Sequence, residues 1–311
     1  MNTDQEAEES QKPLAPGLYL VATPIGNLED ITLRALRVLR SVDKIACEDT
    51  RQTQKLLNHF AIRTPTVSYH MHNEAGRATE LAAVLKAGAR IAVVSDAGTP
   101  GISDPGGQIA AAAIAAGVPV FPVPGANAAI SGLVASGLVG EAFTFHGFLP
   151  AKEGQRRTAL ETLKNSVIPS EGRNAAAVEG PAAHMPHIFY EAPHRILGTL
   201  ADVEAIFGPA QHVVVARELT KLHEEFLRGA VSEVRKTLAD RDSVRGEIVL
   251  LFAPALVPPP DAKPASTVGQ EVRYLIKKEG LTEKDALKQV ARSRNMSKSE
   301  AYRELQRERG K

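Results

Sequence analysis

The chain has 311 residues, of which 43% are hydrophobic and 23% are charged, and its formal net charge is +1. This composition excludes a largely disordered chain. The net charge is too small to indicate a nucleic-acid-binding protein by itself. The single cysteine, Cys47, excludes an internal disulfide and a multi-cysteine metal site, and its position in an apolar run favours a buried strand thiol over a nucleophile.

The first sixteen residues are polar and acidic, and they lack the basic start and apolar core of a signal peptide. We expect residues 1–16 to be disordered. No window approaches eighteen consecutive apolar residues, so no membrane span and no membrane partner are expected. The sequence therefore predicts a cytoplasmic protein.

Residues 17–138 alternate short apolar runs with helical patterns. Strands are expected at 18–22, 44–47, 66–69, 90–95 and 118–123, and helices at 32–41, 50–60, 73–87, 104–116 and 126–136. The expected helix N-caps are Thr32, Thr50, Asn73 and Asp104. This alternation predicts a parallel sheet covered on both faces, with a ligand site beyond the C-terminal ends of its strands.

Residues 139–253 predict a second α/β domain, with a boundary near 137–142. Strands are expected at 143–148, 187–190, 212–216 and 247–252, and helices at 155–164, 194–207 and 232–240. The segment 165–186 is rich in Ala, Gly, Pro and Ser, which predicts an extended loop between a helix and a strand.

The five prolines of residues 254–266 predict a stiff linker. Residues 267–311 follow, with 12 Lys or Arg against 7 Asp or Glu. Their pattern predicts two helices joined by a turn, capped by Thr282 and Ser297, each with an acidic residue three positions on. This basic tail favours RNA docking, and the alternative is a solvated helical pair with ordinary charge pairing.

The segment from Ser95 to Gly107 follows a predicted strand and contains four glycines and two prolines in 13 residues. Glycine lets the backbone approach a ligand closely, and Asp96 could bind ribose hydroxyls or an amine. A tight turn needs fewer such residues, so we interpret the segment as a ligand-binding loop. The sequence has no G-x-G-x-x-G, and no Lys and Ser/Thr follow the glycines at 101 and 106, which argues against dinucleotides and nucleoside-triphosphate hydrolysis.

Two more Gly/Pro loops, at 22–30 and 122–129, also follow strands of the first predicted sheet, so one crevice could receive all three. Polar clusters occupy further strand ends, at 47–51, 148–152, 189–195 and 216–221. Their Arg and Lys residues would attract a phosphate-bearing substrate. The alternative for each cluster is a salt-bridged helix start.

Two strings are highly specific: TPIGNLED at 23–30 and SDAGTPGISDPG at 95–106. Together with 18–22, 31–35, 47–51, 124–128, 189–195 and 216–221, they resemble the ribosomal RNA small subunit methyltransferase I family, a branch of the tetrapyrrole methylase superfamily. The resemblance runs from about residue 17 to 252 and weakly through the tail. It implies two α/β domains of tetrapyrrole-methylase type with S-adenosylmethionine in the cleft between them, followed by a small C-terminal helical module.

The implied reaction is 2′-O-methylation of a cytidine in the decoding region of 16S rRNA, within the small (30S) ribosomal subunit. The resemblance places S-adenosylmethionine against Ser95, Asp96, Ala97, Gly98, Asn127, Ala128, Tyr190 and, more weakly, Leu219. The superfamily's first loop usually has a G-P-G-D core, whereas residues 23–27 here read TPIGN, which favours the RNA-modifying branch. A homodimer is a further expectation carried over from the superfamily.

A ribose hydroxyl is a poor nucleophile, so we hypothesise that Asp49 or Glu191 accepts or orients its proton. Lys152 is a further catalytic candidate, as a cation that stabilises the oxyanion or holds a flanking phosphate. Flanking phosphates would be held by Arg51, Arg195, Arg217 and Lys221. No metal is required. Two alternatives stay open: a small-molecule tetrapyrrole methyltransferase, and a non-catalytic RNA-binding assembly factor that senses S-adenosylmethionine.

Overall fold

A computed structural model describes residues 13–71, 73–138, 142–167, 185–254, 268–279, 281–293 and 296–309. The chain divides into two compact units, Met1–Leu256 and Val257–Lys311. Our predictions for residues 1–12, 168–184 and 255–266 lie outside the described residues. Of the loop expected at 165–186, residues 165–167 belong instead to the end of a helix.

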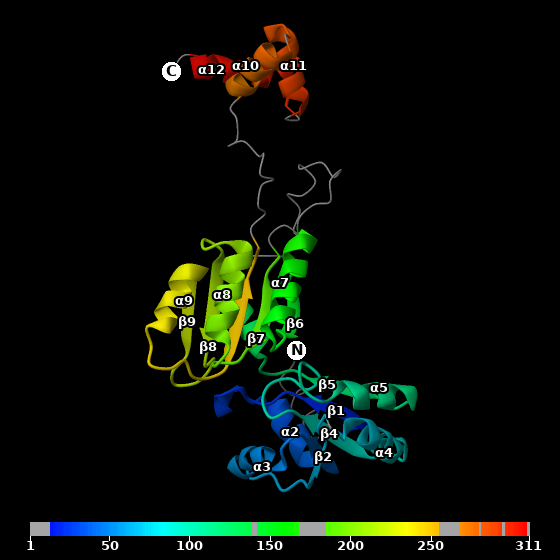
Figure 1. The fold of residues 1–311 in the computed structure, drawn as a ribbon. Helices are drawn as coiled ribbons and strands as arrows, with labels where there is room; N and C mark the ends of the chain where they lie inside the picture. The colour runs from blue at the N-terminus through cyan, green and yellow to red at the C-terminus, as the bar shows by residue number, and fades with distance from the viewer. Residues whose placement is uncertain are drawn as a thin grey trace. The chain divides into compact units, whose positions relative to one another are not determined.

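The N-terminal half of the first unit is a five-stranded parallel sheet in the order β3-β2-β4-β1-β5 (Figure 1). Its strands are β1 (Gly17–Val21), β2 (Lys44–Cys47), β3 (Thr66–Ser68), β4 (Arg90–Val94) and β5 (Val120–Val123). The predicted parallel sheet is confirmed. Because β1 lies between β4 and β5, the loops that follow these three strands are neighbours at the C-terminal end of the sheet.

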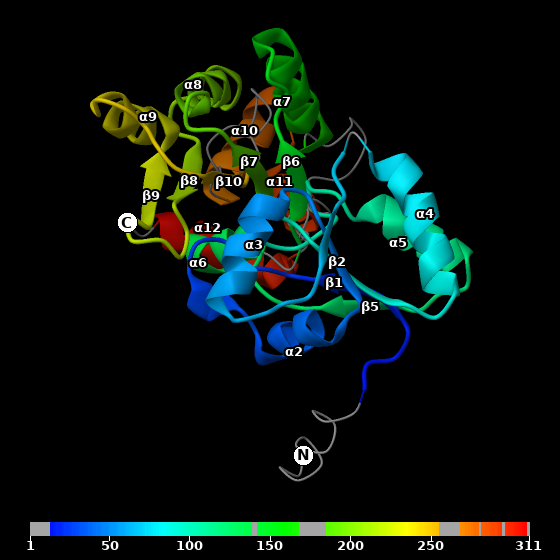
Figure 2. The ribbon, with the colours of Figure 1, turned by 90° about the horizontal axis from the view of Figure 1, so that it is seen from below.

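Helices cover both faces of this sheet (Figure 2). On one face lie α2 (Leu33–Ser41) and α3 (Thr50–His59), and on the other α4 (Glu74–Lys86) and α5 (Gly107–Ala115). Cys47 is fully buried in β2, as predicted, and this burial raises the pKa of its thiol.

The helix caps confirm some predictions and correct others. Thr32 caps α2, since its Oγ1 accepts a hydrogen bond from the Ala35 amide at 3.1 Å. Asp49, not Thr50, caps α3. Asn73 occupies the N-cap position of α4 without a side-chain cap bond. Asp104 caps nothing, because α5 has Gly106 as its N-cap and begins only at Gly107.

The C-terminal half of the first unit is a mixed sheet in the order β6-β7-β10-β8-β9. Three strands run in one direction: β6 (Thr144–Phe148), β7 (His187–Glu191) and β8 (His212–Arg217). β10 (Ile248–Phe252), between β7 and β8, and β9 (Glu225–Ala230), at the edge, run in the opposite direction. β9 has no counterpart among the predicted strands, because its sequence EFLRGA lacks a continuous or alternating apolar pattern.

Helices again lie on both faces of this second sheet. One face packs against α7 (Glu153–Val167), α8 (Ile196–Phe207) and α9 (Val231–Ala239). The other packs against α6 (Ala128–Ser136), which follows β5 of the first sheet. A segment that leaves one sheet therefore contributes to the core of the other.

The two halves also meet where the loop after β1 packs against residues 219–221. A Cβ atom on Gly26 would lie 2.9 Å from Thr220 Oγ1 and 3.1 Å from the Leu219 carbonyl oxygen, and it would collide with Lys221 Cγ. Only a residue without a side chain fits this contact.

The second unit contains α10 (Val268–Glu279), α11 (Glu283–Ser293) and α12 (Lys298–Arg309) around a small core of their own. The caps at Thr282 and Ser297 are confirmed, with hydrogen bonds from the Asp285 and Glu300 amides, each at 3.2 Å. The prediction of two helices was incomplete because it omitted α10. No helix in the described ranges is both long and apolar enough to cross a membrane.

We predict that Gly26→Ala destabilises the protein by about 1–3 kcal/mol, since the added methyl group overpacks the contact between the halves. Gly76→Ala is the matched control. Gly76 lies in α4 with no atom within 4 Å of an added Cβ, so the same change should stabilise by about 0.5–1 kcal/mol. Urea denaturation measures both. Equal effects of the two substitutions would contradict the contact.

Candidate active site

The three Gly/Pro loops are tied together by hydrogen bonds. The Thr23 amide donates to the Gly98 carbonyl oxygen at 2.9 Å, and the Gly98 amide donates to the Thr23 carbonyl oxygen at 3.0 Å. Thr99 Oγ1 donates to the Ala126 carbonyl oxygen at 3.1 Å. These bonds join the loops after β1, β4 and β5, as expected from their shared position.

The far end of the loop after β4 is anchored by a buried network. Glu74 Oε1 accepts hydrogen bonds from the Gly106 amide at 3.1 Å and from the Tyr69 hydroxyl at 2.9 Å. The Tyr69 oxygen in turn accepts from the Ile109 amide at 3.2 Å. Burial and the Glu74 carboxylate raise the pKa of Tyr69, so its hydroxyl remains a donor. The network therefore holds the Gly106 end of the loop in place. Gly98 and Gly106, at the two ends of this stretch, both have positive φ.

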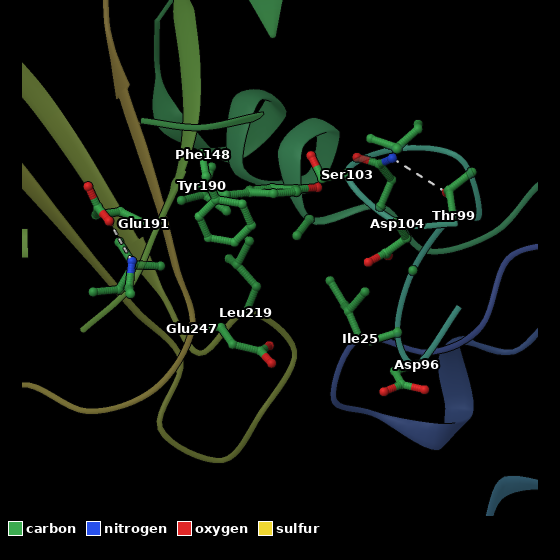
Figure 3. A pocket seen from close by; sticks show the side chains of 18 of the residues that line it. Ile25, Asp96, Thr99, Ser103, Asp104, Phe148, Tyr190, Glu191, Leu219 and Glu247 are labelled. Atoms are coloured by element: carbon green, nitrogen blue, oxygen red, sulfur yellow. Dashed lines mark hydrogen bonds between the residues drawn. The ribbon is translucent and has the colours of Figure 1, made fainter. Parts of the chain in front are cut away.

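A cavity of about 370 Å³ lies between these loops and the edge of the second sheet where β6, β7 and β8 end and β10 begins. This size is at the lower end of small-molecule sites. Its apolar walls include Ile25, Tyr190 and Leu219, and Figure 3 shows these side chains facing the open space. Phe148 also lines it, and its aromatic side chain is 57% exposed.

The charged groups of the cavity wall are all acidic. Asp96, Asp104, Glu191 and Glu247 line it, and among the residues that the structure describes there, none is Lys, Arg or His. Lys221, which is not one of the lining residues, lies between Glu218 Oε1 at 2.8 Å and Glu247 Oε2 at 3.2 Å. One cation is therefore shared by two carboxylates. This arrangement disfavours an anionic ligand and favours a cationic one.

Asp104 is a cavity residue that our sequence reasoning missed. Burial, together with the neighbouring carboxylates of Glu48 and Asp96, raises its pKa to about 6, and a hydrogen bond with Ser95 opposes this rise. In Figure 3 its carboxylate points into the cavity. The sequence signal was present, since Asp104 stands among glycines and prolines, but the interpretation as a helix cap concealed it.

The structure brings the predicted cofactor residues together. Seven of them line the cavity: Asp96, Ala97, Gly98, Asn127, Ala128, Tyr190 and Leu219. Ser95 is buried, and its hydroxyl donates to the Ala97 carbonyl oxygen at 3.1 Å. Asn127 also caps α6. Their contacts with a cofactor remain a prediction.

Glu191 does not have the geometry of a proton acceptor for a substrate. Its side chain is fully buried, and Figure 3 shows it directed away from the centre of the cavity. Oε1 accepts from the Ala192 amide at 2.8 Å, and Oε2 accepts from the Thr199 hydroxyl at 2.6 Å. Arg195 Nε lies 3.0 Å from Oε1. Both oxygens are already engaged, so the geometry argues against a catalytic role and indicates a structural one.

Asp49, Arg51 and Lys152 lie outside the cavity wall. Asp49 caps α3 and pairs with Arg51 at 3.1 Å, which holds the pKa of the Asp49 carboxyl below its usual range. The Asp49 amide donates to Asp96 Oδ1 at 3.1 Å, so Asp49 acts on the cavity through its backbone. Arg51 is 88% exposed, and Lys152 is exposed just before α7.

The other predicted phosphate ligands are bound to protein groups. Arg195 donates to the Leu149 carbonyl oxygen at 2.6 Å and pairs with Glu191. Arg217 pairs with Glu225 at 3.1 Å, and Lys221 with Glu218 and Glu247. The alternative for these clusters was a salt-bridged helix start, and the ion pairs of Arg195, Arg217 and Lys221 fit salt-bridged segments better than free cations.

Comparisons with known proteins support the fold and the family. The family described as Tetrapyrrole (Corrin/Porphyrin) Methylases matches residues 17–235. The ribosomal RNA small subunit methyltransferase I of Synechocystis sp. is 44% identical, with 92% of this chain and 95% of that protein covered. Its Halalkalibacterium halodurans counterpart is 46% identical, with 92% and 93% covered. The chain belongs to this methyltransferase family.

Solved structures with low sequence identity to this chain have the same fold. Uroporphyrin-III C-methyltransferase from Thermus thermophilus superimposes with a TM-score of 0.50 at 19% identity, covering 76% of this chain and 94% of that one. A diphthine synthase gives 0.53 at 13% identity, covering 76% and 89%. The pair of sheets is therefore a tetrapyrrole methylase fold, and it carries methyltransferase chemistry in this family.

We predict that Asp104→Asn stabilises the protein at high pH. Folding raises the pKa of this carboxyl, so below about pH 4 it is protonated in both the folded and the unfolded protein. Between about pH 4 and 6 it ionises more readily in the unfolded protein, which lowers the free energy of unfolding, and this loss persists at higher pH. This rise in pKa corresponds to a loss of about 3 kcal/mol in the free energy of unfolding if the side chain is fully desolvated. Because the side chain is only half-buried, solvent reduces the expected loss to about 1–2 kcal/mol.

Urea denaturation at about pH 4 and pH 8 measures this effect. The stability difference between variant and wild type should be near zero at the lower pH and should grow at the higher one. A difference independent of pH would show that Asp104 is not desolvated by its site.

Proposed function

We propose that this methyltransferase uses S-adenosylmethionine to methylate the 2′-hydroxyl of a cytidine in the decoding region of 16S rRNA. The observation that carries the cofactor assignment is the acid-lined cavity, whose wall has carboxylates and no cation among its described residues. The rRNA substrate is supported by relatives known as ribosomal RNA small subunit methyltransferase I, whose similarity covers 92% of this chain.

The cavity fits this cofactor better than it fits a nucleotide phosphate. S-adenosylmethionine supplies an electrophilic methyl group on a positively charged sulfonium, and it carries an ammonium group as well. Asp96, Asp104 and Glu247 offer negative charge to such a ligand, while Ile25, Tyr190 and Leu219 offer apolar surface. The backbone of Ala97, Gly98, Asn127 and Ala128 would hold its polar edges.

The residues of the cavity would mainly align the methyl group with the ribose hydroxyl and exclude water, because methyl transfer is an in-line displacement. The buried anchor of Glu74 and Tyr69 keeps the loop after β4 in one conformation. The exposed aromatic ring of Phe148 gives the cavity mouth a surface on which a nucleobase could stack, as bases do in single-stranded RNA recognition. The exposed cations Arg51 and Lys152 would meet phosphates outside the cavity.

We also propose a cytoplasmic homodimer that has no membrane partner. The dimer is an expectation from the superfamily, and the mass of the protein in solution tests it.

The in-family alternative is a small-molecule tetrapyrrole methyltransferase, which the fold alone would equally allow. A non-catalytic assembly factor that senses S-adenosylmethionine is the other alternative. Incubation with S-adenosylmethionine labelled in the methyl group separates all three. The substrates are purified 30S subunits, naked 16S rRNA and a precorrin.

We expect label on a cytidine 2′-oxygen of the RNA, located by nuclease digestion and mass spectrometry. Label on the precorrin would support the in-family alternative. Binding of the cofactor without transfer to any substrate would support the non-catalytic factor.

A second prediction concerns the basic tail, residues 267–311. Arg273, Lys284, Lys288, Lys298, Arg303 and Arg307 belong to its described helices. If the tail docks on RNA, its deletion should weaken 30S binding and lower the slope of log affinity against log salt concentration, by about 0.7–0.9 per lost phosphate contact. Cofactor affinity, measured by calorimetry, should not change. Unchanged RNA affinity and slope would assign the tail to another role.

A further inference from the structure

The proposed methylation requires a group that accepts the hydroxyl proton. Glu191 has both carboxylate oxygens engaged inside the protein, and Asp49 caps α3 outside the cavity wall. Neither of the carboxylates favoured by the sequence is therefore free to receive a proton in the cavity. The carboxylates on the wall itself remain to be considered.

Three carboxylates other than Glu191 line the cavity, and they differ in exposure and partners. Asp96 is exposed, and its Oδ1 accepts the Asp49 amide. Glu247 is 75% exposed and pairs with Lys221. Asp104 is half-buried, and no Lys, Arg or His among the described residues forms a salt bridge with it.

The position of Asp104 follows from the backbone of its loop. Ser103 has a φ of 61° and Gly106 a φ of 147°, so the chain is not helical where Asp104 stands. Gly147 of β6 is close to this turn, since a Cβ there would lie 3.1 Å from Ser103 Oγ. The turn therefore sits against the second sheet, and its carboxylate is directed into the cavity toward Leu219 and Tyr190 (Figure 3).

We propose that Asp104 is the general base of the methyl transfer; this inference rests on the proposed function. The ribose 2′-oxygen forms a bond to the methyl carbon as the carbon–sulfur bond breaks. The electron pair of that bond goes to sulfur, which becomes a neutral thioether, and the hydroxyl proton goes to the Asp104 carboxylate. Atoms and charge balance without a metal or another reactant.

The charges around Asp104 suit this role. Ser95 and Asp96 face it from the loop after β4, Glu48 from the end of β2, and Tyr190 from β7. Negative neighbours make a carboxylate more basic, and a pKa of about 6 is closer to physiological pH than that of an ordinary Asp. A bound sulfonium would oppose this effect and lower the pKa, so cofactor binding should release a proton from Asp104.

Proton release can be measured without any substrate. Calorimetry of S-adenosylmethionine binding near pH 6, in buffers of different ionisation enthalpy, counts the protons released. We expect a fraction of a proton from the wild type and none from Asp104→Asn. Affinity of the wild type should also rise as pH increases through about 6. Equal release from both proteins would show that Asp104 does not face the cofactor and would overturn the proposal, whatever the RNA substrate is.

Kinetics then separate catalysis from binding. With saturating cofactor and 30S subunits, Asp104→Asn should lower kcat by about 10²–10⁴-fold, the range for loss of a general base. Its dissociation constant for the cofactor should stay within about tenfold of the wild type. The wild-type rate should fall as pH drops and Asp104 is protonated, and the variant should lack this dependence. Asp104→Glu should recover part of the rate.

Glu48→Gln is the matched control, since it removes a neighbouring carboxylate that does not line the cavity. It should keep most of the activity, with the acid limb of the pH profile moved to lower pH. Full kcat in Asp104→Asn with weakened cofactor binding would make Asp104 a cofactor ligand and overturn the proposal. Loss of the acid limb in Glu48→Gln alone would assign the base to Glu48. Proton release from Asp104 without methylation of any RNA would instead contradict the proposed function.

Discussion

The pair of backbone hydrogen bonds between Thr23 and Gly98 is the constraint on which the site depends. β1 lies between β4 and β5, and this pair fastens the loop after β1 to the loop after β4. The same first loop carries Gly26, whose lack of a side chain lets residues 219–221 of the second half approach. One short loop thus contacts both the loop after β4 and residues 219–221, and it contributes Ile25 to the cavity wall.

The charge pattern then determines what the cavity can hold. Basic side chains near the strand ends are satisfied by carboxylates or carbonyl oxygens, as Arg195 and Arg217 show, so they contribute little positive field. On the cavity wall, Glu191 and Glu247 are ion-paired, whereas Asp104 forms no salt bridge with a described cation and its pKa is raised. A site that is destabilised until a cationic ligand arrives is a common feature of binding and catalysis.

The sequence predicted the first sheet and the convergence of its three loops, because both follow from local patterns: buried apolar runs, and Gly/Pro residues at strand ends. Seven of the eight residues that the family resemblance assigns to the cofactor line one cavity, and their contacts with a cofactor stay a prediction. The sequence could not predict the direction of side chains. Glu191 ends an apolar strand and Asp104 stands in the loop after one. Only the hydrogen bond from Thr199 and the turn at Ser103 show that Glu191 is engaged and that Asp104 faces the cavity. β9 escaped prediction because its strand pairs with β8 without an apolar pattern of its own.

The central claim is that the acid-lined cavity between the two sheets holds the methyl donor. A crystal structure of the protein with S-adenosylhomocysteine, the reaction product of that donor, tests it most directly. We predict that the ligand lies between the loop after β4 and Leu219, with its sulfur facing the Asp104 carboxylate. A ligand bound elsewhere, or one in the cavity with its sulfur turned away from Asp104, would contradict the account.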